Sequence, residues 1–129
     1  ESREVIITLS DHTDYVRCLA LSGDNRRLIS GSDDQSIIVW DLERQSSEYT
    51  LKGHENYVLC LGISGDGSML VSGSRDNTIK IWNLEKRTET CSLEKHSDSV
   101  YGVTISNDGK TVVSGSEDRT VRIWQIERD

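Results

Sequence analysis

The chain has 129 residues, a formal charge of −7 at neutral pH, no proline and no phenylalanine. This length fits one compact domain, and no apolar run approaches the ~20 residues that a membrane-spanning helix needs. The basic residues are scattered rather than clustered, so we expect neither nucleic acid nor a membrane as a partner.

The three cysteines, Cys18, Cys60 and Cys91, indicate neither a disulfide framework nor a zinc site. Their number is odd, and no Cys-x-x-Cys or Cys/His spacing typical of a metal site is present. We therefore expect buried, reduced thiols in an intracellular protein of the cytoplasm or nucleus, with no metal and no cofactor. No signal peptide, glycosylation sequon or lipidation motif is visible.

A step of 42 residues recurs along the whole chain, separating Trp40, Trp82 and Trp124 as well as sets of histidines, glycines and aspartates. A fixed period of this length indicates one supersecondary unit written three times. The repeats span about residues 3–44, 45–86 and 87–129. A residue type present at the same place in every repeat is expected to build the unit rather than to act as a single catalytic group.

The repeats predict short strands joined by tight turns. The chain opens with an alternating segment, residues 4–9, which predicts a strand. In the second repeat, strands are expected at residues 48–51, 57–64, 68–72 and 78–84, and the third repeat opens with one at 88–93. The hairpin signal Ser64-Gly65-Asp66-Gly67 follows the strand at 57–64. No segment has a helical period, so the sequence predicts an all-β antiparallel meander with four strands per repeat.

Two dipeptides carry a resemblance that covers essentially the whole chain. Gly53-His54 and Trp40-Asp41 are intact, whereas the other repeats keep only the histidine or the tryptophan. The chain resembles the WD-repeat family of β-propellers, whose blades are four-stranded sheets. In that family the repeat is offset from the blade, which implies blades at about residues 14–51, 56–93 and 98–126. The last blade would be completed by the strand 4–9 of a neighbouring chain.

Each repeat also contains a serine, a histidine and an aspartate, the residue types of a hydrolase triad. The resemblance implies a structural network instead, in which the tryptophan N–H bonds the serine, the serine bonds the histidine and the histidine bonds the aspartate. We therefore expect no enzyme; a hydrolase is the alternative. The network residues are His12, Ser30, Asp34, Trp40, His54, Ser72, Asp76, Trp82, His96, Ser114, Asp118 and Trp124.

The resemblance also implies a contact surface for protein or peptide partners on the narrower, top face of the propeller. Tyr15 and Tyr57 suit an interface anchor because their rings are rigid and amphipathic. The expected partner-binding residues are Thr13, Tyr15, Asp33, Glu55, Tyr57, Arg75, Ser97, Ser99 and Glu117. Their charges are mixed, so the sequence specifies no particular ligand.

Three blades are too few to close a propeller, since known rings have about four to eight blades or slightly more. We therefore expect head-to-tail self-assembly into a ring. A trimer with nine blades is favoured over a dimer with six, because the aliphatic residues Leu21, Ile63 and Ile105 stand where the family commonly has a phenylalanine. Thinner packing between blades would reduce the angle that each blade occupies in the ring. The alternative is an engineered or excised repeat fragment with no function beyond self-assembly.

Overall fold

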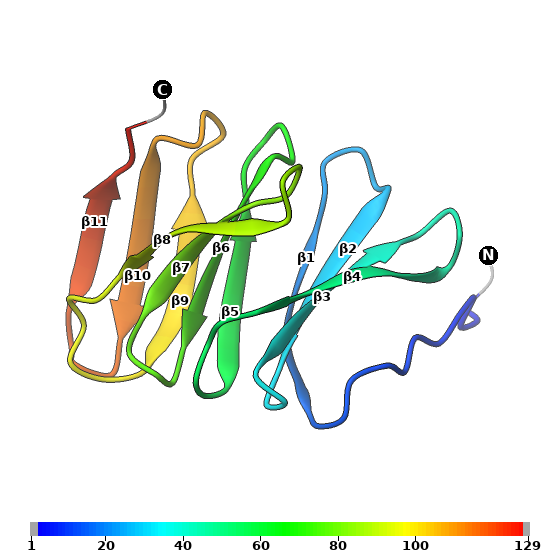
Figure 1. Cartoon of the computed structure of the whole chain (residues 1–129), viewed down its shortest axis with the longest axis horizontal. Helices are drawn as coiled ribbons and strands as arrows, with labels where there is room; N and C mark the ends of the chain where they lie inside the picture. The colour runs from blue at the N-terminus through cyan, green and yellow to red at the C-terminus, as the bar shows by residue number, and fades with distance from the viewer. Residues whose placement is uncertain (1–2, 128–129) are drawn as a thin grey trace.

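The computed structural model describes residues 3–127 and consists of three antiparallel β-sheets. The sheets stand side by side along the long axis of the molecule, and the two ends of the chain lie at opposite ends of that axis (Figure 1). The predicted all-β class is confirmed. Among the described residues there is no helix that is long and apolar enough to cross a membrane.

The first two sheets have four strands each, and the third has three. The first sheet contains β1 (Val16–Leu21), β2 (Arg27–Ser32), β3 (Ser36–Asp41) and β4 (Ser46–Lys52). The second contains β5 (Val58–Ile63), β6 (Met69–Ser74), β7 (Ile79–Asn83) and β8 (Thr88–Leu93). The third contains β9 (Val100–Ile105), β10 (Thr111–Ser116) and β11 (Val121–Gln125). Strands adjacent in sequence pair with each other, as in a meander.

The hairpin between the first two strands of each sheet is built by a serine and an aspartate. In the second sheet Ser64 Oγ donates to Asp66 Oδ1 at 2.8 Å and accepts from the N–H of Met69 at 3.1 Å. Gly67 follows with a φ of 76°, a left-handed conformation that glycine adopts without steric strain. These local bonds explain why the Ser-Gly-Asp-Gly signal in the sequence marks a turn.

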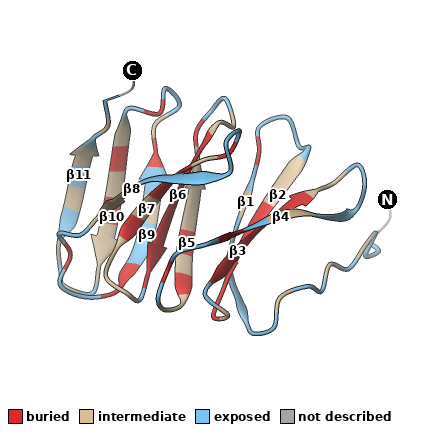
Figure 2. Cartoon of the chain, viewed as in Figure 1, coloured by how far each residue is buried: buried red, intermediate tan, exposed pale blue. Residues whose placement is uncertain are grey.

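The hydrophobic core lies between the sheets. Buried residues concentrate on β2, β3, β6 and β7, whereas β1 and β11 are largely exposed or half-buried (Figure 2). One cluster joins the first and second sheets and contains Ile29, Ile37, Val39, Leu51, Val58, Leu70, Trp82 and Leu84. The other joins the second and third sheets and contains Cys60, Met69, Val71, Ile79, Ile81, Val100, Ile105 and Val112.

The segment at residues 4–9 forms no strand within the single chain. A strand needs a hydrogen-bonded partner, and this segment runs beyond the first sheet, at the end of the molecule opposite to β11 (Figure 1). Val5 and Ile6 are accordingly among the most exposed large apolar residues. That residues 4–9 complete the last sheet of a neighbouring chain stays a prediction.

Candidate functional site

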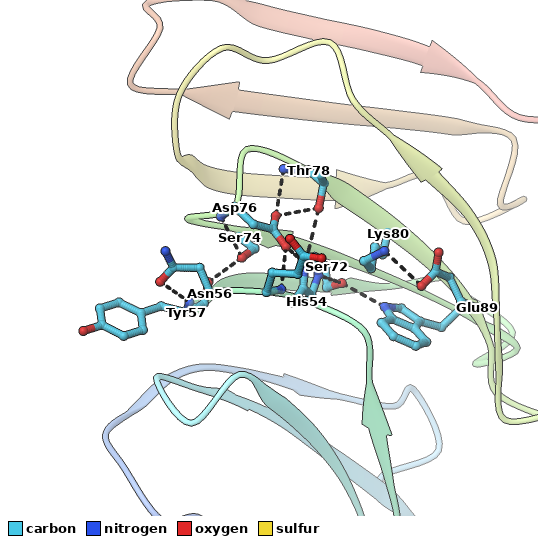
Figure 3. Close-up of polar contacts among 11 residues, drawn as sticks. His54, Asn56, Tyr57, Ser72, Ser74, Asp76, Thr78, Lys80 and Glu89 are labelled. Carbon is cyan, nitrogen blue, oxygen red and sulfur yellow. Dashed lines mark hydrogen bonds and ion pairs between the residues drawn. The ribbon is translucent and has the colours of Figure 1, made fainter.

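The polar network of the second sheet is a continuous chain of four side chains. Trp82 Nε1 donates to Ser72 Oγ at 2.8 Å, and Ser72 Oγ lies 2.7 Å from His54 Nε2. His54 Nδ1 lies 2.9 Å from Asp76 Oδ2. Figure 3 shows His54 between the serine and the aspartate. Because the ionised carboxylate can only accept, Nδ1 of His54 carries a hydrogen, which leaves Nε2 to accept from the serine hydroxyl in a neutral ring.

The same chain of bonds is present in the other two sheets. In the first, the tryptophan–serine, serine–histidine and histidine–aspartate distances are 2.8, 2.6 and 2.8 Å. In the third, they are 3.0, 2.7 and 2.7 Å. The structure thus brings together all twelve residues expected in the networks, as three sets of four: Trp40, Ser30, His12 and Asp34; Trp82, Ser72, His54 and Asp76; Trp124, Ser114, His96 and Asp118.

The turn that carries each aspartate holds its carboxylate in place. Asp76 Oδ1 accepts from the backbone N–H of Thr78 at 2.9 Å and from its hydroxyl at 2.5 Å, and Oδ2 accepts from the N–H of Glu55 at 3.0 Å. Burial alone would raise the pKa of the Asp76 carboxyl, but the hydrogen bonds from His54 and Thr78 outweigh it and hold that pKa well below its usual range. The carboxylate therefore stays charged and acts as the anchor of the network.

This geometry suits a structural hydrogen-bond network better than a catalytic triad. Ser72 is fully buried, and one lone pair of its oxygen already accepts from the indole N–H. A nucleophile needs an approach path for the substrate and a free lone pair directed at it. The hollow beside the network reaches the aspartate but not the serine, being lined by Gly53, Glu55, Asp76, Asn77, Thr78, Lys80, Glu94 and His96.

The predicted partner-binding residues lie at the edge of the sheets where the first strand begins. In every repeat, the predicted residue just before the network aspartate donates its backbone N–H to the carbonyl oxygen of a predicted residue just before the first strand. The N–H of Asp33 donates to Tyr15 at 2.9 Å, that of Arg75 to Tyr57 at 3.0 Å and that of Glu117 to Ser99 at 3.0 Å. The N–H groups of Thr13, Glu55 and Ser97 instead donate to the network aspartates at 3.1, 3.0 and 3.1 Å.

Arg17 forms an ion pair with two hydrogen bonds on this edge, and it was not among the predicted binding residues. Its guanidinium makes two hydrogen bonds of 2.7 Å to Asp33 and lies over the rings of Tyr15 and Tyr57, at 5.6 and 5.9 Å from their centres. Arg75 lies 5.5 Å from the centre of the Tyr57 ring. We call these five residues, Tyr15, Arg17, Asp33, Tyr57 and Arg75, the edge cluster.

A β-bulge explains the position of Arg17. In the β1–β2 ladder Val16 pairs with Ser32 and Cys18 with Gly31, so Arg17 is the extra residue. A bulge redirects the side chain of the extra residue, here toward the edge cluster. No local pattern in the sequence indicates the bulge. An arginine 16 residues before an aspartate becomes a pair only once the strand register is known.

None of the described residues form a group of three or more histidine, cysteine or acidic side chains suited to a metal ion. Burial raises the pKa of the Cys18 and Cys60 thiols to about 12, so both stay protonated at neutral pH.

Comparison with known proteins agrees with this architecture. The family model for the WD domain, G-beta repeat, matches residues 3–41, 45–83 and 87–125. An uncharacterized WD repeat-containing protein of Schizosaccharomyces pombe is 52% identical over 44 residues, which are 34% of this chain and 12% of that protein. The solved structures of the RRP9 WD40 repeats and of U3-55K each align with a TM-score of 0.88 and 31% identity over 92% of this chain.

The chain spans only 37% and 38% of the length of those two solved structures. Its three sheets therefore correspond to a part of each of those two structures. The chain belongs to the WD40-repeat family, as three tandem repeats that fold into propeller-type blades.

Proposed function

We propose that the chain is a non-catalytic interaction scaffold that closes head to tail with further copies into a propeller ring and offers the edge cluster to a protein or peptide partner. WD40 repeats generally serve as non-catalytic scaffolds. Three free thiols suit an intracellular compartment. The observation that carries the ring is the exposure of the two terminal sheets.

Side chains that are buried between sheets inside the chain are exposed at its ends. Ile79 and Ile81 of β7 are 0% exposed, whereas Val121 and Ile123, at the same places in β11, are 73% and 74% exposed. At the other end Leu19 and Leu21 of β1 are 63% and 50% exposed. Contiguous apolar surface of this kind is typical of an interface, and the two ends are different faces, as a head-to-tail contact requires.

Within the ring, we favour three copies and nine blades over two copies and six. The aliphatic residues Ile63 and Ile105 fill their positions between sheets with less volume than an aromatic ring would. A thinner layer between blades favours a smaller angle per blade, and a smaller angle needs more blades to complete a circle.

The edge cluster is the surface that we assign to a partner. Tyr15 is 72% exposed although its ring lies beside the Arg17–Asp33 ion pair. A tyrosine held in this way buries a large area on binding with little loss of rotamer entropy, and Tyr and Arg are the residues most enriched in interface hot spots. Asp33 fixes the Arg17 guanidinium, so this part of the surface is pre-organised.

Solution mass tests the ring. Sedimentation equilibrium of the 129-residue chain should give a multiple of 14.5 kDa, with three copies as the expected value. A single-chain mass at every concentration would contradict closure by self-assembly.

The edge cluster needs a separate test, with partners captured by the wild-type chain and then identified. Tyr15→Ala and Tyr57→Ala should weaken their binding and leave the solution mass unchanged. Lys86→Ala, a change at an exposed position in the turn between β7 and β8, is the control and should bind as the wild type does.

A further inference from the structure

The two interfaces inside the chain share one steric detail, in which a valine of the following sheet fills the space above a glycine. A Cβ added to Gly31 would lie 2.6 Å from Cγ1 of Val58, and one added to Gly73 would lie 2.7 Å from Cγ1 of Val100. Both valines are 0% exposed. No real side chain tolerates such a distance, so glycine is required wherever the next sheet brings its valine.

The third glycine of this set, Gly115, has no valine above it. Among residues 3–127 no heavy atom lies within 4 Å of a Cβ added there, apart from its chain neighbours, and the same is true of Gly102. We call the space above each of these glycines, where the valine of the next sheet packs, a glycine socket. Gly102 stands where the other repeats have Cys18 and Cys60, whose sulfurs line the glycine sockets at Gly31 and Gly73. The resulting apolar hollow on the third sheet is lined by Gly102, Val103, Thr104, Val113, Ser114, Gly115 and Val121.

The matching valine lies at the other end of the same chain. Val16 precedes Val58 by 42 residues, begins β1 as Val58 begins β5, and is 50% exposed. One end of the chain thus has a free glycine socket, and the other end has the free valine that fits it.

We infer that Val16 of a second copy of this chain packs against Gly115 and Gly102, while residues 4–9 of that copy pair with β11 as the missing fourth strand. This inference rests on the proposed head-to-tail ring and specifies its contact. The occupant is a second copy because the two internal interfaces already show how this chain's own valine and glycine fit together.

The internal sheets also specify the register of the added strand. In the β7–β8 ladder Ile79 pairs with Leu93, Ile81 with Cys91 and Trp82 with Glu89, and Thr90 is left out. The β3–β4 ladder repeats this arrangement with Glu48 left out. Applied to β11, the same register pairs Val121 with Leu9, Ile123 with Ile7 and Trp124 with Val5 of the second copy, and leaves Ile6 out.

The first experiment changes the socket without disturbing the fold of the chain. Gly115→Val adds a side chain that suits a strand, and its Cβ has no heavy atom of residues 3–127 within 4 Å apart from its chain neighbours. The added side chain would collide with Val16 of a second copy. We expect the variant to have the single-chain mass of 14.5 kDa at concentrations where the wild type is assembled. Its unfolding midpoint, measured at a dilution where both proteins are single chains, should equal that of the wild type.

Two matched variants sharpen this test. Gly102→Cys restores the thiol of the internal sockets and should strengthen association by about 3-fold or more, as expected for added apolar packing. Gly115→Val combined with Val16→Gly exchanges the two partners and should recover part of the lost association.

Cross-linking tests the register. In a Cys91→Ser background, Leu9→Cys with Val121→Cys should form disulfides between chains under mild oxidation, seen as a ladder on a non-reducing gel. The slipped pair Thr8→Cys with Val121→Cys should form few, because its side chains point to opposite faces of the sheet.

The outcomes separate the inference from the ring itself. If the wild type assembles but Gly115→Val keeps the wild-type mass, the socket is wrong and the ring stands. If the slipped pair cross-links better than the predicted pair, the register is wrong. A wild-type chain that stays single at every concentration overturns both the ring and the inference.

Discussion

Nε1 of Trp82 lies 2.8 Å from Oγ of Ser72, and both side chains are buried. The hydroxyl also contacts His54 Nε2 at 2.7 Å, so one oxygen joins β6, β7 and the loop before β5. The buried indole N–H of Trp82 loses its hydrogen bonds to water on folding, and the Ser72 oxygen replaces them. The tryptophan–serine pair is therefore the centre of the hydrogen-bond network rather than an accessory contact.

Removing that oxygen should destabilise the second sheet. In Ser72→Ala, the Trp82 N–H and His54 Nε2 lose their shared partner in a dry environment. We expect the free energy of unfolding to fall by about 1–3 kcal/mol, measured by urea denaturation followed by tryptophan fluorescence. His54→Ala removes the next member of the hydrogen-bond network, and the loss in the free energy of unfolding should lie in the same range.

The third sheet provides a matched control, because Trp124 is only half-buried. Its N–H is 3.0 Å from Ser114 Oγ, the longest of the three tryptophan–serine bonds. Measured on the single chain, Ser114→Ala should destabilise less than Ser72→Ala, since water can replace the lost bond. Equal losses would contradict a dependence on burial.

The network aspartates should make the fold sensitive to acid. The pKa of Asp76 is lower in the folded chain than its ordinary value of 3.8, so the unfolded chain takes up the proton first as the pH falls. The stabilisation is present above about pH 4 and is lost as the pH falls toward the folded-state pKa. Asp76→Asn should be less stable at pH 7 and should lose less stability on acidification, measured by urea unfolding from pH 7 to pH 3. An unchanged pH slope would contradict this role.

The turns after the second strands hold non-glycine residues in the left-handed region. Gln35, Asn77 and Arg119 have φ values of 73°, 74° and 72°. Gln35→Gly and Arg119→Gly should raise the free energy of unfolding by roughly 0.5–1 kcal/mol, because the strain removed exceeds the added chain entropy. Asn77→Gly should change it less, since asparagine tolerates this conformation. Thermal unfolding of the three variants gives the comparison, and a loss of stability in Gln35→Gly would contradict it.

The thiols of Cys60 and Cys91 should differ in reactivity. Burial raises the pKa of Cys60 to about 12, and that residue lies in the core between the second and third sheets. Cys91 lies on β8, at the outer edge of its sheet, and is half-buried. An aromatic disulfide reagent at pH 8 should therefore modify Cys91 first and Cys60 only on unfolding, as followed by mass spectrometry of the labelled peptides. Modification of Cys60 at the rate of Cys91 in the folded protein would contradict the burial.

The sequence determined the repeat, the all-β class and the family. Three local features carried these predictions: the Trp40–Trp82–Trp124 step, the turn residues around Gly67 and the missing helical period. Such features can be recognised in the sequence without knowing how the sheets pack. The tryptophan–serine–histidine–aspartate chain followed from the resemblance, and the structure places each set within hydrogen-bonding distance.

Only the tertiary structure decided how the sheets meet. The Arg17–Asp33 pair depends on a bulge that shifts the register by one residue, and a register is fixed by the opposing strand. The contact of Val58 with Gly31 and the opening above Gly115 depend on how closely two sheets approach. The segment at residues 4–9 has the alternation of a strand but no edge beside it within the chain, because a strand acquires its partner from the fold and not from its own residues.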